Sequence, residues 1–358
     1  MALALARRGL GRTGTNPSVG CVIVRDGIVL GRGRTAEGGR PHAETRALAD
    51  AAARFGPGAA RGATAYVTLE PCAHHGGTPP CTDAFIRAGI ARVVAPLTDP
   101  DPRVAGKGFA TLRAAGIAVE IGPGAREASA LLAPYLRMRR TGRPTLTLKL
   151  ATTLDGRIAT RTGRSQWITG SAARHRVHLM RARADAILTG IGTVLADDPA
   201  LDVRLPGMEG TSPVPVIADR ALRTPPTARV LAPGTALILG DAAAHPARAD
   251  ALRAAGASVV QAQAGAGVAA LLDLVAARGH GAIFCEGGAT LAAALIRAGC
   301  VDRLAWFTGG MVLGADARGA LDACGIDRLA DAPRFRQVSC QSIGPDTLGI
   351  WDREEESP

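Results

Sequence analysis

Short, continuous apolar runs alternate along the chain with segments in which apolar residues recur at helical spacing. In the first part of the chain these runs predict buried strands, and the turn signal Asp26-Gly27 makes the first two a hairpin. This alternation of strands and helices predicts a layered α/β domain. A short helix is expected at the N-terminus, followed by strands at 20–24, 28–34, 63–69, 91–95 and 117–121 and helices at 43–54, 81–88, 106–115 and 124–139.

The periodicity breaks at the basic segment 139–144, which we interpret as a solvated linker. We therefore expect two domains, residues 1–142 and residues 143–358, each long enough to bury a core of its own. The polar tail 354–358 is expected to be disordered. In the second domain the pattern predicts a helix at 171–184 and strands at 145–150, 186–189, 214–219, 236–239, 258–261, 282–285, 303–307, 335–339 and 347–351.

The charge and cysteine content narrow the class of protein. The formal net charge is +11, but the basic residues are scattered and only 3% of residues are aromatic, which weighs against a nucleic-acid partner. Seven cysteines without regular spacing indicate a reducing compartment. No apolar run approaches the roughly 18 residues of a membrane span, and no signal-peptide pattern begins the chain. We expect a cytoplasmic protein without a membrane partner, and a homo-oligomer stays open.

Zinc chemistry is indicated by a Pro-His-Ala-Glu motif that is followed by two Pro-Cys pairs. One imidazole and two thiolates can hold Zn²⁺ and leave one coordination position open for water. A carboxylate two residues after the imidazole can move protons for that water. This order of residues is typical of zinc deaminases that act on nucleobase-like rings. We therefore assign His42, Cys72 and Cys81 as metal ligands and Glu44 as the catalytic acid–base.

The main alternative is a closed structural zinc site in which His74 or His75 is the fourth ligand. Such a site needs no acid beside its histidine, and Glu44, two positions after His42, does not share its face on a helix. Asn16 stands before the first strand, where its amide could bind the edge of a substrate ring. Turn formation explains a lone Asn equally well.

Near the end of the chain, a buried strand passes through Glu286-Gly287-Gly288 into a helix. Glycines let a ligand approach the backbone, and the free amides at a helix start favour phosphate. A plain strand-to-helix turn explains the same pattern, so phosphate binding is one of two interpretations of this segment.

With both halves considered, the chain resembles the bifunctional riboflavin-biosynthesis deaminase–reductases of bacteria. The resemblance covers nearly the whole chain and rests in the first half on residues 16–17, 20–24, 41–44, 67–72, 74–76 and 78–81. In the second half it rests on residues 148–150, 154–157, 165–169, 193–199 and 286–288. The eight residues that separate Cys72 from Cys81 are unusual for a deaminase in general and resemble a feature of this family.

The resemblance implies an α/β protein with an N-terminal cytidine-deaminase-like three-layer α/β/α domain and a C-terminal dihydrofolate-reductase-like α/β domain. The first would bind one Zn²⁺ and deaminate 2,5-diamino-6-(5-phosphoribosylamino)pyrimidin-4-one. The second would use NADPH to reduce the ribosyl group of 5-amino-6-(5-phosphoribosylamino)uracil to ribityl. By the same resemblance, NADPH would lie against Ala151, Trp167, Thr193, Asp197, Gly288, Ala289, Thr290, Leu291, Ala292, Ala293 and Ala294. The phosphoribosyl substrate would contact Ser165, Arg181, Leu201, Arg204 and Glu286.

Two positions depart from the family pattern. Gly77 stands where the family usually has Arg or Lys, and Ala73 where it usually has Ser. If the usual cation contacts the substrate phosphate, its loss would weaken substrate binding by the deaminase. In the reductase, Lys149 and Asp155 are candidate proton donors, with ordinary structural roles as the alternative. The chain also begins a few residues later than the family pattern, so we expect a short first helix.

Two other functions stay open from the sequence. One is a deaminase of nucleotides or tRNA bases whose second domain is not catalytic. The other is a zinc-stabilised RNA-binding protein, which the scattered arginines and the missing aromatic platform disfavour.

Overall fold

The chain forms two compact units in its computed structural model, which describes residues 1–208 and 210–354. The first unit is Met1–Arg143, and the second begins at Pro144, one residue after the predicted boundary. Residues 355–358 of the predicted tail lie outside the described residues. Among the described helices, none combines the length and the apolar character that crossing a bilayer requires.

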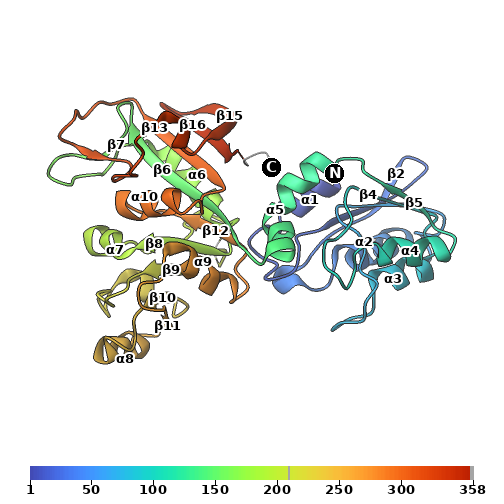
Figure 1. Cartoon of the computed structure of the whole chain (residues 1–358). Helices are drawn as coiled ribbons and strands as arrows, with labels where there is room; N and C mark the ends of the chain where they lie inside the picture. The colour runs from blue at the N-terminus through green and yellow to red at the C-terminus, as the bar shows by residue number, and fades with distance from the viewer. Residues whose placement is uncertain (209, 355–358) are drawn as a thin grey trace. The chain divides into compact units, whose positions relative to one another are not determined.

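The first unit is built on five strands, β1 (Gly20–Arg25), β2 (Ile28–Arg34), β3 (Thr64–Val67), β4 (Arg92–Ala95) and β5 (Ala118–Ile121). They form one sheet in the order β2-β1-β3-β4-β5, of which β2, β4 and β5 are labelled in Figure 1. β1 pairs antiparallel with both β2 and β3, which confirms the predicted hairpin. β3, β4 and β5 run parallel, so helical crossovers must connect them.

Helices cover both faces of this sheet. They are α1 (Ala2–Arg7), α2 (Ala43–Phe55), α3 (Cys81–Ala88), α4 (Lys107–Ala114) and α5 (Ala125–Thr141). α1 and α5 contact each other, while α2, α3 and α4 form a second contacting group. Gly20 lies against the backbone of α1, whereas Gly33, which pairs with the adjacent Cys21, lies against α2. Because successive strand residues face opposite sides, the unit has three layers.

A close approach between β2 and α2 fixes the position of the helix at which the zinc motif begins. An added Cβ would lie 2.1 Å from the carbonyl oxygen of Ala47 at Gly31, and 2.1 Å from that of Ala43 at Gly33. Only glycine lets a helix lie this close to a strand. Ala43, Ala47 and Ala51 are fully buried on the facing side of α2, so small residues on both elements set where the helix starts.

The second unit is built on a nine-stranded sheet in the order β11-β10-β9-β8-β12-β6-β13-β16-β15. The strands from β11 to β13 are parallel, and β16 and β15 add to them antiparallel. The strands are β6 (Thr145–Thr153), β8 (Ala186–Gly190), β9 (Val214–Ala218), β10 (Leu237–Gly240), β11 (Ser258–Gln261), β12 (Ala282–Cys285), β13 (Arg303–Gly309), β15 (Phe335–Ile343) and β16 (Asp346–Arg353). A separate pair, not predicted, consists of β7 (Arg157–Ala159) and β14 (Arg318–Gly319).

Two cores lie on opposite faces of this second sheet. Ala186 and Leu188 of β8 pack in one core, and Ile187 between them packs in the other, as the alternation of strand side chains requires. The helices are α6 (Ser171–Arg181), α7 (Ile191–Asp197), α8 (Pro246–Ala254), α9 (Val268–Ala276) and α10 (Ala289–Arg297). The adjacent parallel strands β8 and β12 lead into α7 and α10, so the starts of these helices meet at the carboxyl edge, where ligands bind in open α/β sheets.

Candidate functional site

The predicted metal ligands come together in the first unit. His42 is the residue before α2, Cys81 is the first residue of α3, and Cys72 lies in the segment between β3 and α3. The Nδ1 atom of His42 lies 3.6 Å from Sγ of Cys72 and 3.3 Å from Sγ of Cys81. The three potential ligand atoms all lie within 4.8 Å of one another, and no fourth such ligand among the described residues joins the group. This donor set suits zinc with an open position.

Backbone contacts hold the two cysteines together despite the long loop between them. The amide of Cys81 donates to Sγ of Cys72 at 3.4 Å, and the amide of Thr82 donates to the carbonyl of Cys72 at 3.2 Å. The hydrogen bond between the two side chains lowers the pKa of Cys72 to about 4, with a further contribution from His42. The same bond and burial raise the pKa of Cys81.

Glu70 is a positioning residue that the sequence analysis missed. It is buried, and its carboxylate accepts hydrogen bonds from the backbone amides of Asp99, Gly106, Gly108 and Phe109, at 2.9 to 3.2 Å. An added Cβ at Gly108 would lie 2.0 Å from the carbonyl oxygen of the neighbouring Pro71. These contacts fasten the 99–109 segment to the chain that carries Cys72. The sequence offered one signal for this role, because Glu70 directly precedes the first Pro-Cys pair.

Glu44 has the environment of a proton carrier. It is 3% exposed, and its Oε2 atom has no hydrogen-bond partner among the described residues. Burial, followed by the charge of Cys72, raises the pKa of Glu44 to about 7. A buried carboxylate oxygen without a partner is costly, so it marks a place where another group belongs. A zinc-bound water beside the three ligands would fit this orphaned oxygen.

A pocket of about 480 Å³ opens onto these residues. Asn16, His42, Glu44, Cys72 and His74 line it together, so the structure brings Asn16 to the same cavity as two of the predicted ligands, His42 and Cys72. His74 lines the pocket without joining the ligand group, and His75 is exposed. The remaining lining includes Asp99, Asp101, Tyr135 and three arginines, Arg40, Arg103 and Arg139.

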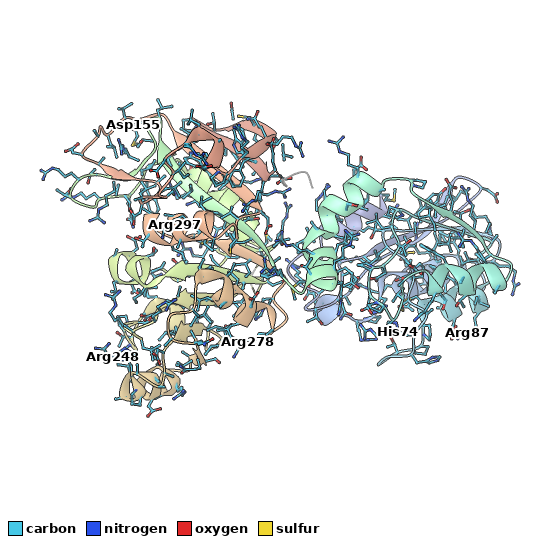
Figure 2. All side chains as sticks on the ribbon, in the orientation of Figure 1. His74, Arg87, Asp155, Arg248, Arg278 and Arg297 are labelled. Atoms are coloured by element: carbon cyan, nitrogen blue, oxygen red, sulfur yellow. The ribbon has the colours of Figure 1, made fainter. Side chains whose placement is uncertain are left out.

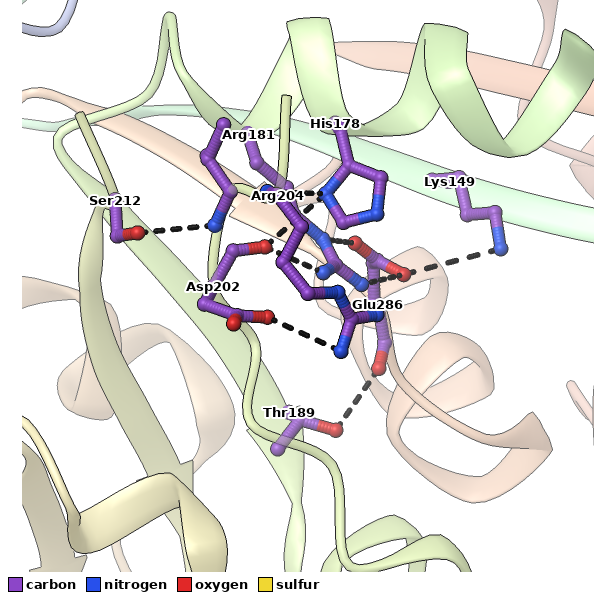
Figure 3. Close-up of polar contacts among 9 residues, drawn as sticks. Lys149, His178, Arg181, Thr189, Asp202, Arg204, Ser212 and Glu286 are labelled. Atoms are coloured by element: carbon purple, nitrogen blue, oxygen red, sulfur yellow. Dashed lines mark hydrogen bonds and ion pairs between the residues drawn. The ribbon is translucent and has the colours of Figure 1, made fainter. Parts of the chain in front are cut away.

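In the second unit, a charged cluster lies where α6, β6 and the end of β12 approach one another (Figure 3). Arg181 donates to both carboxylate oxygens of Glu286, from Nε at 2.5 Å and from Nη2 at 3.0 Å. Lys149 lies 3.9 Å from the same carboxylate. Burial alone would raise the pKa of Glu286, but Arg181 and Lys149 outweigh it and hold the pKa below its usual value. Burial lowers the pKa of Lys149.

The other predicted substrate residues surround this cluster. Arg204 pairs loosely with Asp202 at 3.6 Å and keeps a side chain that is 58% exposed, whereas the side chain of Arg181 is 12% exposed. Leu201 is buried, and Ser165 is half-buried in a loop. His178, which the sequence analysis missed, places Nδ1 3.2 Å from the carbonyl oxygen of Asp202 and 3.3 Å from the amide nitrogen of Arg204 (Figure 3).

The predicted cofactor residues lie on two helix starts and on flanking segments. Gly288 is the residue before α10, and an added Cβ there would lie 3.7 Å from the hydroxyl of Thr193 on α7. Thr193 and Gly288, the residue before α10, are therefore neighbours. The predicted residues 289–294 follow on α10, while Ala151 lies on β6 and Asp197 ends α7. Trp167 is 64% exposed, and the guanidinium of Arg174 lies 4.5 Å from its ring centroid.

The two candidate proton donors of the reductase have different surroundings. Asp155 (Figure 2) accepts hydrogen bonds from the hydroxyl of Thr153 at 2.5 Å and from the amide of Gly314 at 2.8 Å. These bonds stabilise a turn and lower the pKa of Asp155 to about 2. Lys149 belongs instead to the Glu286 cluster, so only Lys149 lies with the predicted substrate residues.

Comparison with known proteins accounts for both units. The chain matches the cytidine and deoxycytidylate deaminase zinc-binding region over residues 1–97 and the RibD C-terminal domain over residues 144–348. The fold and the sites are those of a zinc-dependent deaminase joined to a reductase. The chain belongs to the RibD family of riboflavin biosynthesis proteins. It is 43% identical over 360 residues to the riboflavin biosynthesis protein RibD of Escherichia coli (strain K12), covering 96% of this chain and 95% of that protein.

Solved structures of this family have the same fold. A structure of Acinetobacter baumannii RibD has a TM-score of 0.89 and 39% identity, covering 99% of this chain and 97% of that one. The diaminohydroxyphosphoribosylaminopyrimidine deaminase/5-amino-6-(5-phosphoribosylamino)uracil reductase of Thermotoga maritima has a TM-score of 0.86 and 34% identity, covering 98% and 96%. The predicted fold class is confirmed, and a bifunctional deaminase–reductase is favoured over a deaminase with a non-catalytic second domain.

Proposed function

We propose that the first unit hydrolytically deaminates 2,5-diamino-6-(5-phosphoribosylamino)pyrimidin-4-one. We further propose that the second unit then reduces the ribosyl group of 5-amino-6-(5-phosphoribosylamino)uracil to ribityl with NADPH. The observation that carries the proposal is the convergence of His42, Cys72 and Cys81 beside the unpartnered oxygen of Glu44. It occurs in a chain that is similar to RibD proteins over both units.

In the deaminase, His42, Cys72 and Cys81 would hold zinc, which supplies a water activated for attack on the amino-bearing ring carbon. Glu44 would take one proton from this water and deliver it to the ring nitrogen, and would then carry the remaining hydroxyl proton to the amino group, which departs as ammonia. Its burial excludes bulk water, which would compete for that proton. Asn16 holds the edge of the ring through its amide, as its place in the same pocket supports.

In the reductase, NADPH supplies the hydride that forms the new C–H bond at C1′ of the ribosyl group. The bond from C1′ to the ring oxygen breaks, and this oxygen takes up a proton. Lys149 is the proposed donor, because its pKa is lowered by burial and it lies in the cluster of predicted substrate residues. Asp155 is set aside, because backbone amides and a hydroxyl already occupy its carboxylate.

The predicted binding residues divide between the two ligands of this reaction. The amides at Gly288 and the start of α10, next to Thr193, suit a cofactor phosphate. Ala151, Trp167, Asp197 and residues 289–294 complete the proposed NADPH site. Ser165, Arg181, Leu201, Arg204 and Glu286 are the proposed substrate residues. Of the two arginines, Arg204 is the more accessible to a substrate phosphate.

Product masses test the proposal. The purified zinc-loaded protein is incubated with the diaminopyrimidine substrate, with and without NADPH. Without NADPH, we expect the deaminated ribosyl compound and one ammonia per product, and with NADPH the deaminated ribityl compound. Recovery of unchanged substrate in both reactions would contradict the proposal, and deamination without any reduction would favour a second unit that only binds.

We also propose a cytoplasmic location, the absence of a nucleic-acid partner, and a homo-oligomeric state. Cys21, Cys81, Cys285 and Cys340 are free thiols, which supports a reducing cytoplasm. Arg248 on α8, Arg278 after α9 and Arg297 on α10 are exposed at different places on the second unit (Figure 2), which fits the scattered basic residues of the sequence. β15 is an almost wholly exposed edge strand, which supports a homo-oligomer because such edges are usually covered. Light scattering and a nucleic-acid binding assay test the last two.

A further inference from the structure

Three arginines line the deaminase pocket, and two of them are already paired. Arg103 lies 2.6 Å from the carboxylate of Asp101, and Arg139 lies 3.6 Å from the same group. Asp99, next to Asp101 on the pocket wall, is a second acid beside these cations. This wall of the pocket therefore carries roughly balanced charge, and its arginines are held by protein carboxylates.

Arg40 is the third arginine, and its surroundings differ. It stands two positions before His42, is exposed, and lines the same pocket. Its Nη1 donates to the hydroxyl of Thr78 at 2.7 Å, which fixes the guanidinium without neutralising it. Within residues 1–208 and 210–354, no carboxylate lies close enough to Arg40 to form an ion pair. Arg40 is thus an oriented cation at a pocket whose other arginines are paired.

The loop between the two cysteines leaves space around this guanidinium. An added Cβ at Gly76 would lie 3.1 Å from Nη2 of Arg40, and one at Gly77 would lie 3.7 Å from its Cζ. With glycine at both positions, no side chain from them covers the cation. Here the charge beside this loop comes from another segment of the chain, through Arg40.

We propose that Arg40 binds the phosphate of the deaminase substrate. This inference rests on the proposed function, which places the pyrimidine ring at the zinc ligands and directs its phosphoribosyl group away from them. A guanidinium presents several donors in a fixed plane and pairs with phosphate through two of them. With one nitrogen held by Thr78, the others of Arg40 stay available to the phosphate oxygens.

The test compares phosphorylated and dephosphorylated substrates. For Arg40→Ala, we expect the KM of deamination to rise about 10- to 100-fold with the phosphoribosyl substrate, since hydrogen bonds to charged groups are of this strength. The kcat should stay unchanged, and so should the KM for the matching ribosyl compound. Arg87→Ala is the matched control, because Arg87 is exposed on α3 and does not line the pocket (Figure 2). It should leave both KM values unchanged.

A second variant separates a lost charge from a disturbed site. Adding Gly77→Lys to Arg40→Ala should recover most of the lost affinity, because the Cβ space at Gly77 is open and its backbone φ is not positive. Bound zinc, measured by metal analysis, should equal that of the unsubstituted protein. Equal KM increases for both compounds would overturn the inference and make Arg40 a support for His42. An unchanged KM for the phosphoribosyl substrate would mean that another residue binds its phosphate. A failure of the proposed function is distinguishable, because the unsubstituted protein would then release no ammonia.

Discussion

The two sites differ in how their buried charges are satisfied. In the first unit, the buried carboxylate of Glu44 has one oxygen without a partner among the described residues. In the second unit, the carboxylate of Glu286 is closed by a two-point pair with Arg181 and by Lys149. The carboxylate of Glu44 is thus only partly satisfied by protein groups, whereas both oxygens of the Glu286 carboxylate are paired.

This difference indicates two ways to prepare a site for a charged ligand. In the deaminase, one carboxylate oxygen of Glu44 has no partner, and the three ligand atoms contact mainly one another, so zinc would replace only these short-range contacts. The reductase holds Arg181 in a buried pair, so under the proposed function a substrate phosphate would compete with Glu286 or use the more exposed Arg204. A substitution of Glu by Gln, which removes the negative charge, should therefore affect catalysis in the first site and the free energy of unfolding in the second.

The largest effect is expected for Glu44→Gln. It removes the proposed proton carrier and keeps the shape of the side chain, so ammonia release should fall by about 10² to 10⁴-fold. NADPH oxidation with the pre-deaminated substrate should be unchanged, because Glu44 lies in the other unit. Bound zinc should also stay, since Glu44 is outside the ligand group. Ammonia and NADPH assays on the same preparation measure both activities.

Glu127→Gln is the matched control for this change, because Glu127 is an exposed acid on α5 of the same unit. Its ammonia release should equal that of the unsubstituted protein. Loss of both activities in Glu44→Gln would show that the two sites are not separable and would contradict the comparison drawn above.

In the second unit, Glu286→Gln should mainly lower the free energy of unfolding. It leaves Arg181 and Lys149 buried without their counter-charge, which typically costs about 3 to 5 kcal/mol of unfolding free energy. All three tryptophans, Trp167, Trp306 and Trp351, belong to this unit, so tryptophan fluorescence during urea unfolding reports on it selectively.

Asp352→Asn is the control for Glu286→Gln. Asp352 pairs with Arg303 in the same two-point geometry, at 2.6 and 3.0 Å, but both side chains are about one-third exposed. Such a pair contributes about 1 kcal/mol or less. An equal loss of unfolding free energy in the two variants would show that burial does not distinguish the two ion pairs.

The sequence predicts the ligands better than it predicts what supports them. His42, Cys72 and Cys81 carry rare chemistry in a recognisable order, so their convergence could be expected without a fold. Glu70 and His178 act through backbone amides and carbonyls of distant segments, which a sequence pattern does not reveal. The strands were foreseen because apolar runs mark them. β7 and β14 were missed because they are short and contain arginine and glycine.

A smaller effect is expected from Gly33→Val, which tests how the first site is positioned. Any Cβ at this glycine would lie 2.1 Å from the carbonyl oxygen of Ala43, so α2 must move away from β2. Such overpacking costs about 1 to 3 kcal/mol. Because α2 begins directly after His42, bound zinc should also decrease.

Gly310→Ala is the control for Gly33→Val, since nothing lies within 4 Å of its added Cβ. Metal analysis and hydrogen exchange of α2 measure both variants. Full zinc binding and unchanged exchange in Gly33→Val would show that the contact between β2 and α2 does not position the ligands.

The smallest expected effect is the pH dependence of the stability that the Glu286 cluster contributes to the second unit. The pKa of Glu286 is lowered in the folded protein, so its stabilisation is complete above the unfolded pKa of about 4.3 and is lost as pH falls through the folded value. The difference in unfolding free energy between the unsubstituted protein and Glu286→Gln should therefore be constant from neutral pH to about pH 5. It should decrease at lower pH.

Urea unfolding followed by tryptophan fluorescence at several pH values measures this difference. Taking the difference between the two proteins cancels the titration of acids that they share, provided that these acids are not coupled to Glu286. A difference that grew as the pH fell would mean that the folded pKa is raised rather than lowered. Burial would then outweigh the pair with Arg181 and Lys149, and the second site would be as unsatisfied as the first.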